Sequence, residues 1–159
     1  MMDISSYKVN SKEFLIGSSP TILNELNYLK YFIDNKVSLI VKICKEDLYN
    51  KDLFLENKID IIENIQDDGL YPNDDNKKIL DKIYEDYIKN NKKIFFHCKA
   101  GIGRAPTFLG YIVIKYLNKN SNDFITEIRQ LREKSINSIQ LKWLFDLNSN
   151  NKKNSCIIL

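Results

Sequence analysis

The sequence is poor in the residues that build metal sites and disulfide frameworks. Its 159 residues contain one histidine and three cysteines, Cys44, Cys98 and Cys156. One histidine with three scattered cysteines offers no zinc site, so we expect no bound metal. An odd number of widely spaced cysteines argues against a disulfide framework and for a reducing, intracellular compartment.

Long apolar runs and a strong excess of charge are also missing. No stretch approaches the roughly 20 apolar residues that a membrane span needs, and residues 1–6 show neither the charged nor the apolar region of a secretory signal. A net charge of +3 is too small to indicate a nucleic-acid partner by itself. The remaining composition, 43% hydrophobic and 28% charged, is that of an ordinary globular domain.

Apolar periodicity predicts strands that alternate with helices. We expect strands over 7–10, 13–17, 39–44, 59–63 and 94–96, and helices over 22–33, 79–88, 106–118 and 139–147, with another begun by Ser121 or Asn122 as its cap. This order predicts an α/β fold: a central, mostly parallel sheet flanked by helices. A single domain, 1–148, is expected to end in a flexible polar tail, 149–159.

The stretch from His97 to Pro106, HCKAGIGRAP, carries the strongest signal of chemistry. A glycine-bearing loop between strand and helix directs several backbone N–H groups at one spot, where the helix dipole favours an anion. Cys98 at the mouth of this loop is expected to be a thiolate nucleophile, and Arg104 can bind two oxygens of a tetrahedral oxyanion. The pattern indicates attack on phosphate esters, with the phosphate cradled by Lys99, Ala100, Gly101, Ile102, Gly103 and Arg104.

His-Cys, five residues and then Arg resembles the signature of the cysteine-dependent protein tyrosine phosphatases. The variant here is most similar to the phosphatases of regenerating liver, the prenylated type IVA family of the dual-specificity superfamily. The resemblance implies the protein tyrosine phosphatase fold and hydrolysis of phosphate monoesters, on phosphoproteins or phosphoinositides, through a phosphocysteine. It implies no metal or organic cofactor, and it leaves homo-oligomerisation open.

Asp67-Asp68-Gly69 lies about thirty residues before the cysteine, where the family carries its general acid. The oxygen that leaves phosphorus needs a proton, and a mobile carboxylic acid supplies it. The resemblance assigns Asp68 as this acid and Asp67 as a support, although an Asp-Gly pair is also a common turn. The family's Trp-Pro before the aspartates is replaced by Asn64-Ile65-Gln66, so we expect a different loop anchor and less well defined closure.

Two further positions bear on the second half of the reaction. Most relatives carry Ser or Thr after the arginine, donating a hydrogen bond to the cysteine sulfur as water breaks the phosphocysteine. Ala105 lacks this donor, as in the regenerating-liver phosphatases, and predicts slow turnover. In the similar Asn-Ser-x-Gln segment, Gln140 is implied to position that water, and a capping role for Asn137 or Ser138 is equally compatible.

Arg129 and Arg132 share a helix face and are expected to be solvated.

The remaining cysteines carry two implied modifications. The strand that ends in Cys44 resembles the family's strand whose cysteine forms a disulfide with the nucleophile, which implies a Cys44–Cys98 pair; a buried free cysteine is the alternative. Cys156-Ile157-Ile158-Leu159 fits a prenylation box, with terminal Leu selecting geranylgeranyl over farnesyl. A prenyltransferase would then be a partner.

A prenyl group would give peripheral attachment to the cytoplasmic face of the plasma membrane or of endosomes. Only Lys152 and Lys153 lie before the box, and one prenyl chain binds a membrane weakly. The resemblance also implies an alternative function, that of a slow phosphatase or binding module that regulates a CNNM-type magnesium transport mediator.

Overall fold

The computed structural model describes the backbone of residues 1–157 and the side chains of residues 1–148 and 150. A five-stranded sheet runs through the centre in the order β1-β2-β5-β3-β4. β1 is antiparallel to β2, and the other neighbours are parallel. The predicted α/β fold with a mostly parallel sheet is confirmed. The strands are β1 (Ile4–Val9), β2 (Lys12–Ser18), β3 (Val37–Lys42), β4 (Asp60–Glu63) and β5 (Lys93–Cys98).

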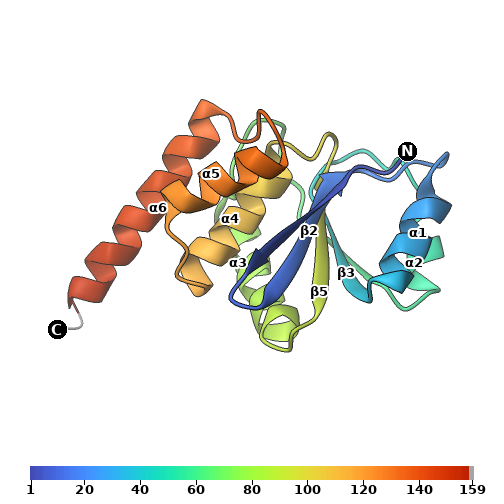
Figure 1. Cartoon of the computed structure of the whole chain (residues 1–159), viewed down its shortest axis with the longest axis horizontal. Helices are drawn as coiled ribbons and strands as arrows, with labels where there is room; N and C mark the ends of the chain where they lie inside the picture. Colours follow the sequence, from blue (N-terminus) through green and yellow to red (C-terminus); the bar gives the residue numbers. More distant parts are fainter. Residues whose placement is uncertain (158–159) are drawn as a thin grey trace.

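Helices cover both faces of the sheet (Figure 1). Two short ones, α1 (Glu25–Asp34) and α2 (Lys51–Leu55), lie on one face. The other face carries α3 (Asp74–Ile83), a π-helical turn η1 (Tyr84–Ile88), α4 (Arg104–Tyr116), α5 (Ser121–Leu131) and α6 (Ser138–Ile157). None of these helices, within the part of the chain described, is both long and apolar enough to cross a membrane.

The alternation of side chains along β5 divides the core in two. Phe96 and Cys98 point into the larger cluster under α3 to α6, and Phe95 points into the smaller one under α1 and α2. α4 is the central helix of the larger cluster, with every residue from Arg104 to Ile114 buried. It begins two residues earlier than predicted, because Pro106 is tolerated in a first turn, where an amide has no helical partner.

Helix α1 differs most from its prediction. It begins at Glu25, and all but one of the aliphatic residues whose spacing predicted it, such as Leu23 with 96% exposure, face solvent; Leu29 packs against the smaller core cluster. Tyr28 and Phe32 are buried against the sheet instead. Aromatic rings at i and i+4 bury more area than the aliphatic positions would, so the helix is rotated relative to the one expected.

The starts of two other helices differ from the sequence predictions. The cap of α5 is Asn120, whose side chain accepts from Asn122 and Asp123, rather than Ser121 or Asn122. The helix expected from residue 79 begins at Asp74, where Asn73 caps it.

The sequence predicts a flexible tail over 149–159; in the structure α6 continues through residues 149–157, and the flexibility of the tail stays a prediction. A segment without apolar periodicity lacks a face that packs on the core, but it can still form a helix. Residues 138–157 contain no glycine or proline that would end the helix. The Cys156 side chain and residues 158 and 159 of the prenylation box lie outside the described residues.

Candidate active site

The nucleophile loop joins the end of β5 to the start of α4, at the C-terminal edge of the sheet. Cys98 is 3% exposed, and its Sγ accepts a hydrogen bond from the Gly101 N–H at 3.2 Å. Gly101 has φ +72°, and a Cβ there would collide with the backbone of Gly17. The loop can therefore fold back over the sulfur only because position 101 is glycine.

Arg132 braces this loop from outside. Its Nε donates to Gly101 O at 2.7 Å and its Nη2 to Ala100 O at 3.3 Å, while both Nη atoms pair with the Asp3 carboxylate. The Arg132 guanidinium holds the pKa of Asp3 below its usual value. Because Arg132 holds the carbonyl groups of Ala100 and Gly101 on the outside of the loop, the loop N–H groups can point inward to the sulfur. The Gly101 N–H does so.

The prediction that Arg129 and Arg132 are solvated surface charges is wrong for Arg132, which is 7% exposed. Arg129 is exposed as predicted, and its guanidinium donates to Ser135 O and Ile136 O at 2.9 and 2.8 Å. The expected shared helix face does not form, because α5 ends at Leu131 and Arg132 follows it with an extended backbone. The sequence carries no signal that marks these carbonyls as partners.

Arg104 lies at the other end of the loop with its side chain 6% exposed. Its Nη1 donates to Gln66 O at 3.0 Å. Its buried Nε has no hydrogen-bond partner among the described residues, and the nearest anion is Asp68 Oδ1 at 3.4 Å. A buried cationic N–H without a partner is costly, so this atom is free to bind an oxyanion that enters the pocket.

The two aspartates before Gly69 have different surroundings. Asp67 pairs with Lys45, whose ammonium holds the pKa of Asp67 below its usual range, so Asp67 stays a carboxylate. Asp68 is 93% exposed beside Arg104, and its Oδ1 accepts from the Gly69 N–H at 3.0 Å. Only Asp68 lies in the pocket with the nucleophile, as the assignment of Asp68 as acid and Asp67 as support requires.

Amide side chains anchor the loop that carries the acid. Asn64 is fully buried and accepts from Asn76 Nδ2 at 2.7 Å, and Asn76 Nδ2 also donates to Ile65 O at 3.1 Å. Gln66 Nε2 donates to Tyr71 O at 2.7 Å and so closes the loop on itself. The anchor differs from the family's Trp-Pro, as predicted, but it is a connected network rather than a loose attachment.

A pocket of about 400 Å³ brings most of the predicted site residues together, but Cys44, Asp67 and Ala105 do not line it. A second hollow of about 220 Å³, between the start of β2 and η1, holds no nucleophile. No group of metal-ligating side chains was found among the described residues. The first pocket is lined by Asp68, Gly69, Cys98, Lys99, Ala100, Ile102, Gly103, Arg104, Lys134, Ile136, Asn137 and Gln140.

Cys44 lies two residues beyond β3, with its Sγ 4.0 Å from His97 Nδ1. Cys44 and Cys98 are both buried and free in this structure. Burial raises the pKa of the Cys44 thiol, against the opposing charge of Lys42, and the charge of Cys98 adds to the rise. The Cys44–Cys98 disulfide stays a prediction.

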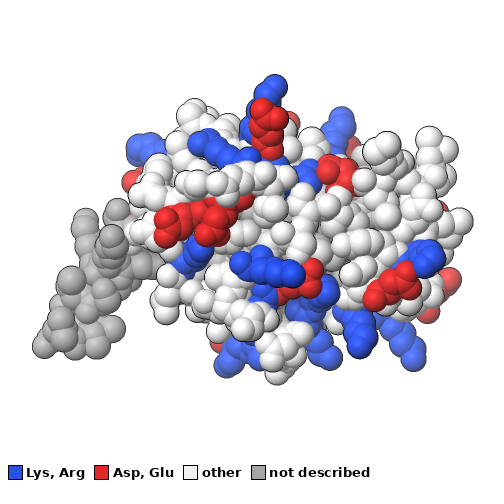
Figure 2. All heavy atoms as spheres, in the orientation of Figure 1, with Lys and Arg blue, Asp and Glu red and all other residues white. Residues whose placement is uncertain are grey.

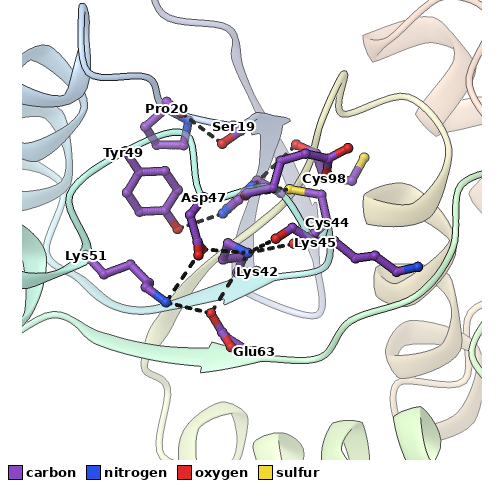
Figure 3. Close-up of polar contacts among 12 residues, drawn as sticks. Ser19, Pro20, Lys42, Cys44, Lys45, Asp47, Tyr49, Lys51, Glu63 and Cys98 are labelled. Carbon is purple, nitrogen blue, oxygen red and sulfur yellow. Dashed lines mark hydrogen bonds and ion pairs between the residues drawn. The ribbon is translucent and has the colours of Figure 1, made fainter.

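No sequence pattern predicts a structural role for Lys42, which ends a mostly apolar strand. Its side chain is 1% exposed, and its Nζ donates to Cys44 O at 2.7 Å. The same ammonium lies 3.3 Å from Asp47 and 3.9 Å from Glu63, and Figure 3 shows it at the centre of these contacts. Lys42 therefore holds in place the backbone that carries Cys44.

Gln140 is fully buried at the start of α6, next to the nucleophile loop. Its N–H donates to Asn137 Oδ1 at 2.9 Å, which gives Asn137 the capping role that the sequence left open. The Gln140 amide itself binds backbone, at Asn137 N–H and Leu70 O. Its implied role in positioning water is untested by these contacts.

Comparisons with known proteins point in the same direction. The sequence model of the family described as "Polymorphic toxin system, DSP-PTPase phosphatase" matches residues 16–118. The protein tyrosine phosphatase PRL-1 of Leishmania major is 30% identical over 92% of this chain and 87% of its own length. The tyrosine-protein phosphatase CDC14 of Candida albicans is 31% identical over 91% of this chain, which spans only 28% of that protein.

A solved structure, titled as a putative protein tyrosine phosphatase from Leishmania major, superposes with a TM-score of 0.77 at 25% identity. The match covers 91% of this chain and 96% of the other. The curated relatives thus divide between the two names PRL and CDC14 at about 30% identity.

Proposed function

Because the chain belongs to the dual-specificity family of cysteine-dependent protein tyrosine phosphatases, we propose that it hydrolyses phosphate monoesters of phosphoproteins or phosphoinositides through a phosphocysteine. One observation carries this proposal: a buried sulfur, an unpartnered guanidinium N–H and an exposed carboxyl share one pocket. Those three groups are the nucleophile, the oxyanion clamp and the acid that the reaction needs.

The reaction divides into two displacements at phosphorus. In the first, the Cys98 thiolate forms the S–P bond as the P–O ester bond breaks, and Asp68 gives its proton to the leaving oxygen. Arg104 and the loop N–H groups bind the non-bridging oxygens. In the second, water attacks phosphorus, the Asp68 carboxylate takes its proton, and the P–S bond breaks to release phosphate and restore the thiolate.

Pre-steady-state cleavage of an aryl phosphate tests this function. We expect one equivalent of phenol in a burst, with phosphate trapped on Cys98 in acid-quenched protein. Cys98→Ser removes both signals, and Asp68→Ala lowers the burst rate for poor leaving groups by about 100- to 10,000-fold. Phenol release by Cys98→Ser at the rate of the unmodified protein would show that another group does the chemistry.

Ala105 leads us to propose that the second displacement is slow. Ala105 is fully buried directly after Arg104, and its methyl group cannot donate a hydrogen bond to the departing sulfur. A hydrogen bond to a charged group contributes about 1.5–3 kcal/mol, so Ala105→Ser should raise the steady-state rate roughly tenfold or more. The burst serves as the internal control, because it reports the first displacement. A steady-state rate that stays unchanged in Ala105→Ser contradicts slow turnover.

We also propose that the chain is of the regenerating-liver type rather than the CDC14 type. Three features support this: the sequence HCKAGIGRAP, Asp67-Asp68-Gly69, and a prenylation box at Cys156. In that type a Cys44–Cys98 disulfide protects the nucleophile, and peroxide would oxidise the two thiols to it with release of two waters. Peptide mapping after peroxide treatment that finds both thiols unlinked removes this part of the proposal.

Ala105 also favours a second candidate function, binding of a membrane partner such as a CNNM-type magnesium transport mediator. A slow second displacement makes the phosphocysteine a long-lived state that can switch affinity. Binding needs no general acid. Asp68→Ala should therefore leave the cellular phenotype intact if binding is the function, whereas Cys98→Ser should abolish it.

A further inference from the structure

The N-terminus of α6 carries a reciprocal cap built from two amides. Asn137 Oδ1 accepts from the Gln140 N–H at 2.9 Å, and Gln140 Oε1 accepts from the Asn137 N–H at 3.1 Å. This is the arrangement of a capping box, for which a side-chain oxygen at each position is sufficient. Ser, Thr or Asp at the first position and Glu at the fourth would serve. An amide at each position leaves an NH₂ group that capping does not use.

Both of these NH₂ groups donate to the loop that carries the acid. Asn137 Nδ2 donates to Gly69 O at 3.0 Å, and Gln140 Nε2 donates to Leu70 O at 3.0 Å. The next loop residue, Tyr71, stacks on Trp143 of α6 with ring centroids 5.3 Å apart and planes 12° apart. Three consecutive residues of the loop, 69–71, are thus attached to α6.

The position of Asp68 depends on these attachments. Its side chain is 93% exposed, and its carboxylate contacts the adjoining Gly69 N–H and lies 3.4 Å from Arg104 Nε. No buried contact of its own holds this carboxyl over the pocket within the described residues. The loop backbone must do so: before Asp68 it is held at Gln66 O by Arg104, and after Asp68 it is held at Gly69 O and Leu70 O by Asn137 and Gln140.

We propose that Asn137 and Gln140 are positioning residues: a helix cap whose spare NH₂ groups hold the acid loop so that Asp68 reaches the leaving group. The proposal rests on the function proposed above. It gives the Asn-Ser-x-Gln segment a role in the first displacement, in addition to any contact of Gln140 with water.

Two variants remove the NH₂ groups while keeping the cap. Asn137→Ser retains a neutral oxygen that accepts from the Gln140 N–H, but it is too short to reach Gly69 O. Gln140→Glu retains the acceptor for the Asn137 N–H and loses the donor to Leu70 O. Asn120→Ser is the matched control, because Asn120 caps α5 away from the pocket, where its Oδ1 accepts from the Asn122 and Asp123 N–H groups.

The first measurement is kcat/KM for aryl phosphates across a range of leaving-group pKa. The phenolate of an acidic phenol leaves phosphorus without a proton. The alkoxide of a weakly acidic alcohol must be protonated by Asp68 as it leaves. We expect Asn137→Ser and Gln140→Glu to lose about tenfold or more on the poor leaving groups and less than twofold on the good ones. The charge added by Gln140→Glu weakens the binding of every phosphate ester equally. This effect therefore cancels when the loss on poor leaving groups is divided by the loss on good ones. Equal losses across the series would overturn the proposal.

A second measurement places Asn137→Ser in an Asp68→Ala background. If Asn137 acts only through Asp68, its loss costs nothing further once the carboxyl is gone. A general structural role predicts the same loss in both backgrounds and would contradict the proposal.

Trp143 provides a measurement that does not depend on activity. It is the only tryptophan of the sequence, and the acid loop covers it through Tyr71. Quenching of its fluorescence by acrylamide should rise in Asn137→Ser and Gln140→Glu and stay unchanged in Asn120→Ser. Unchanged quenching in all three would overturn the proposal. If the unmodified protein cleaves no aryl phosphate, the proposed function fails by itself, and quenching alone still decides whether these amides hold the loop.

Discussion

His97 precedes the nucleophile in the chain, but its imidazole is fully buried and faces Tyr49, whose hydroxyl lies 2.9 Å from Nε2. Burial lowers the pKa of His97 to about 3, and the nearby charges of Lys42 and Arg104 act in the same direction. The ring is therefore neutral in the folded protein at any pH at which the enzyme works. It supports the strand end and takes no part in proton transfer.

The neutral His97 makes folding sensitive to mild acid. Below pH 6.5 the unfolded chain binds a proton on this ring and the folded chain does not, so the free energy of unfolding falls as pH falls. The loss between pH 6.5 and 5 is roughly 1.5 kcal/mol. Urea unfolding at both pH values measures it, with His97→Gln as the variant that should lose this dependence.

Because the sequence holds one histidine, its imidazole signals can also be followed directly by NMR. They should not titrate between pH 7 and 5. A midpoint near 6.5 would show that the ring is exposed to water and would contradict the burial seen here.

At the scale of elements, the end of α5 controls the shape of the nucleophile loop. Arg132 follows α5 directly and contacts two loop carbonyls together with Asp3. A guanidinium makes these contacts in one plane, and an ammonium cannot reproduce them. Arg132→Lys should therefore loosen the loop and weaken binding of tungstate or phosphate by about tenfold, which is the loss of roughly one charged hydrogen bond.

Arg129→Lys is the control for this prediction. Arg129 also fixes backbone carbonyls, those of Ser135 and Ile136, but neither belongs to the nucleophile loop. Both variants should unfold at lower urea concentration, whereas only Arg132→Lys should show weaker oxyanion binding in calorimetry. Equal binding by the two variants would mean that the Arg132 contacts do not shape the loop.

The elements also show what a sequence can predict. Strand β5, α4 and the loop between them were predictable because local chemistry specifies them: an apolar strand, two glycines, and a proline suited to a first helical turn. Asp68 was identified by the family resemblance and by its distance from Cys98, and its role as the acid stays a proposal. Asn137 was predicted only as a possible cap and Gln140 only as a residue that positions water, because their contacts with the acid loop are to residues about 70 positions away. Lys42 was missed and Arg132 was misassigned for the same reason, since each binds backbone carbonyls that no side-chain pattern reports.

On the scale of the whole molecule, the pocket and the C-terminal cysteine belong to opposite ends of α6. The helix begins beside the pocket at Asn137 and Gln140 and runs to Ile157, away from the C-terminal edge of the sheet (Figure 1). At 1.5 Å per residue, Cys156 lies about 27 Å along the axis from the first turn. On the face shown in Figure 2, Lys and Arg lie among Asp and Glu rather than in one basic patch.

This separation makes a test of prenylation possible without disturbing catalysis. With a geranylgeranyltransferase present, we expect the unmodified protein to gain one lipid on Cys156 by mass spectrometry. It should then sediment in part with vesicles, since a single chain binds only weakly. Cys156→Ser should stay in the supernatant and cleave aryl phosphates at an equal rate. Equal sedimentation of the two proteins would contradict lipid attachment, and a lower rate in Cys156→Ser would show that the end of α6 influences the pocket.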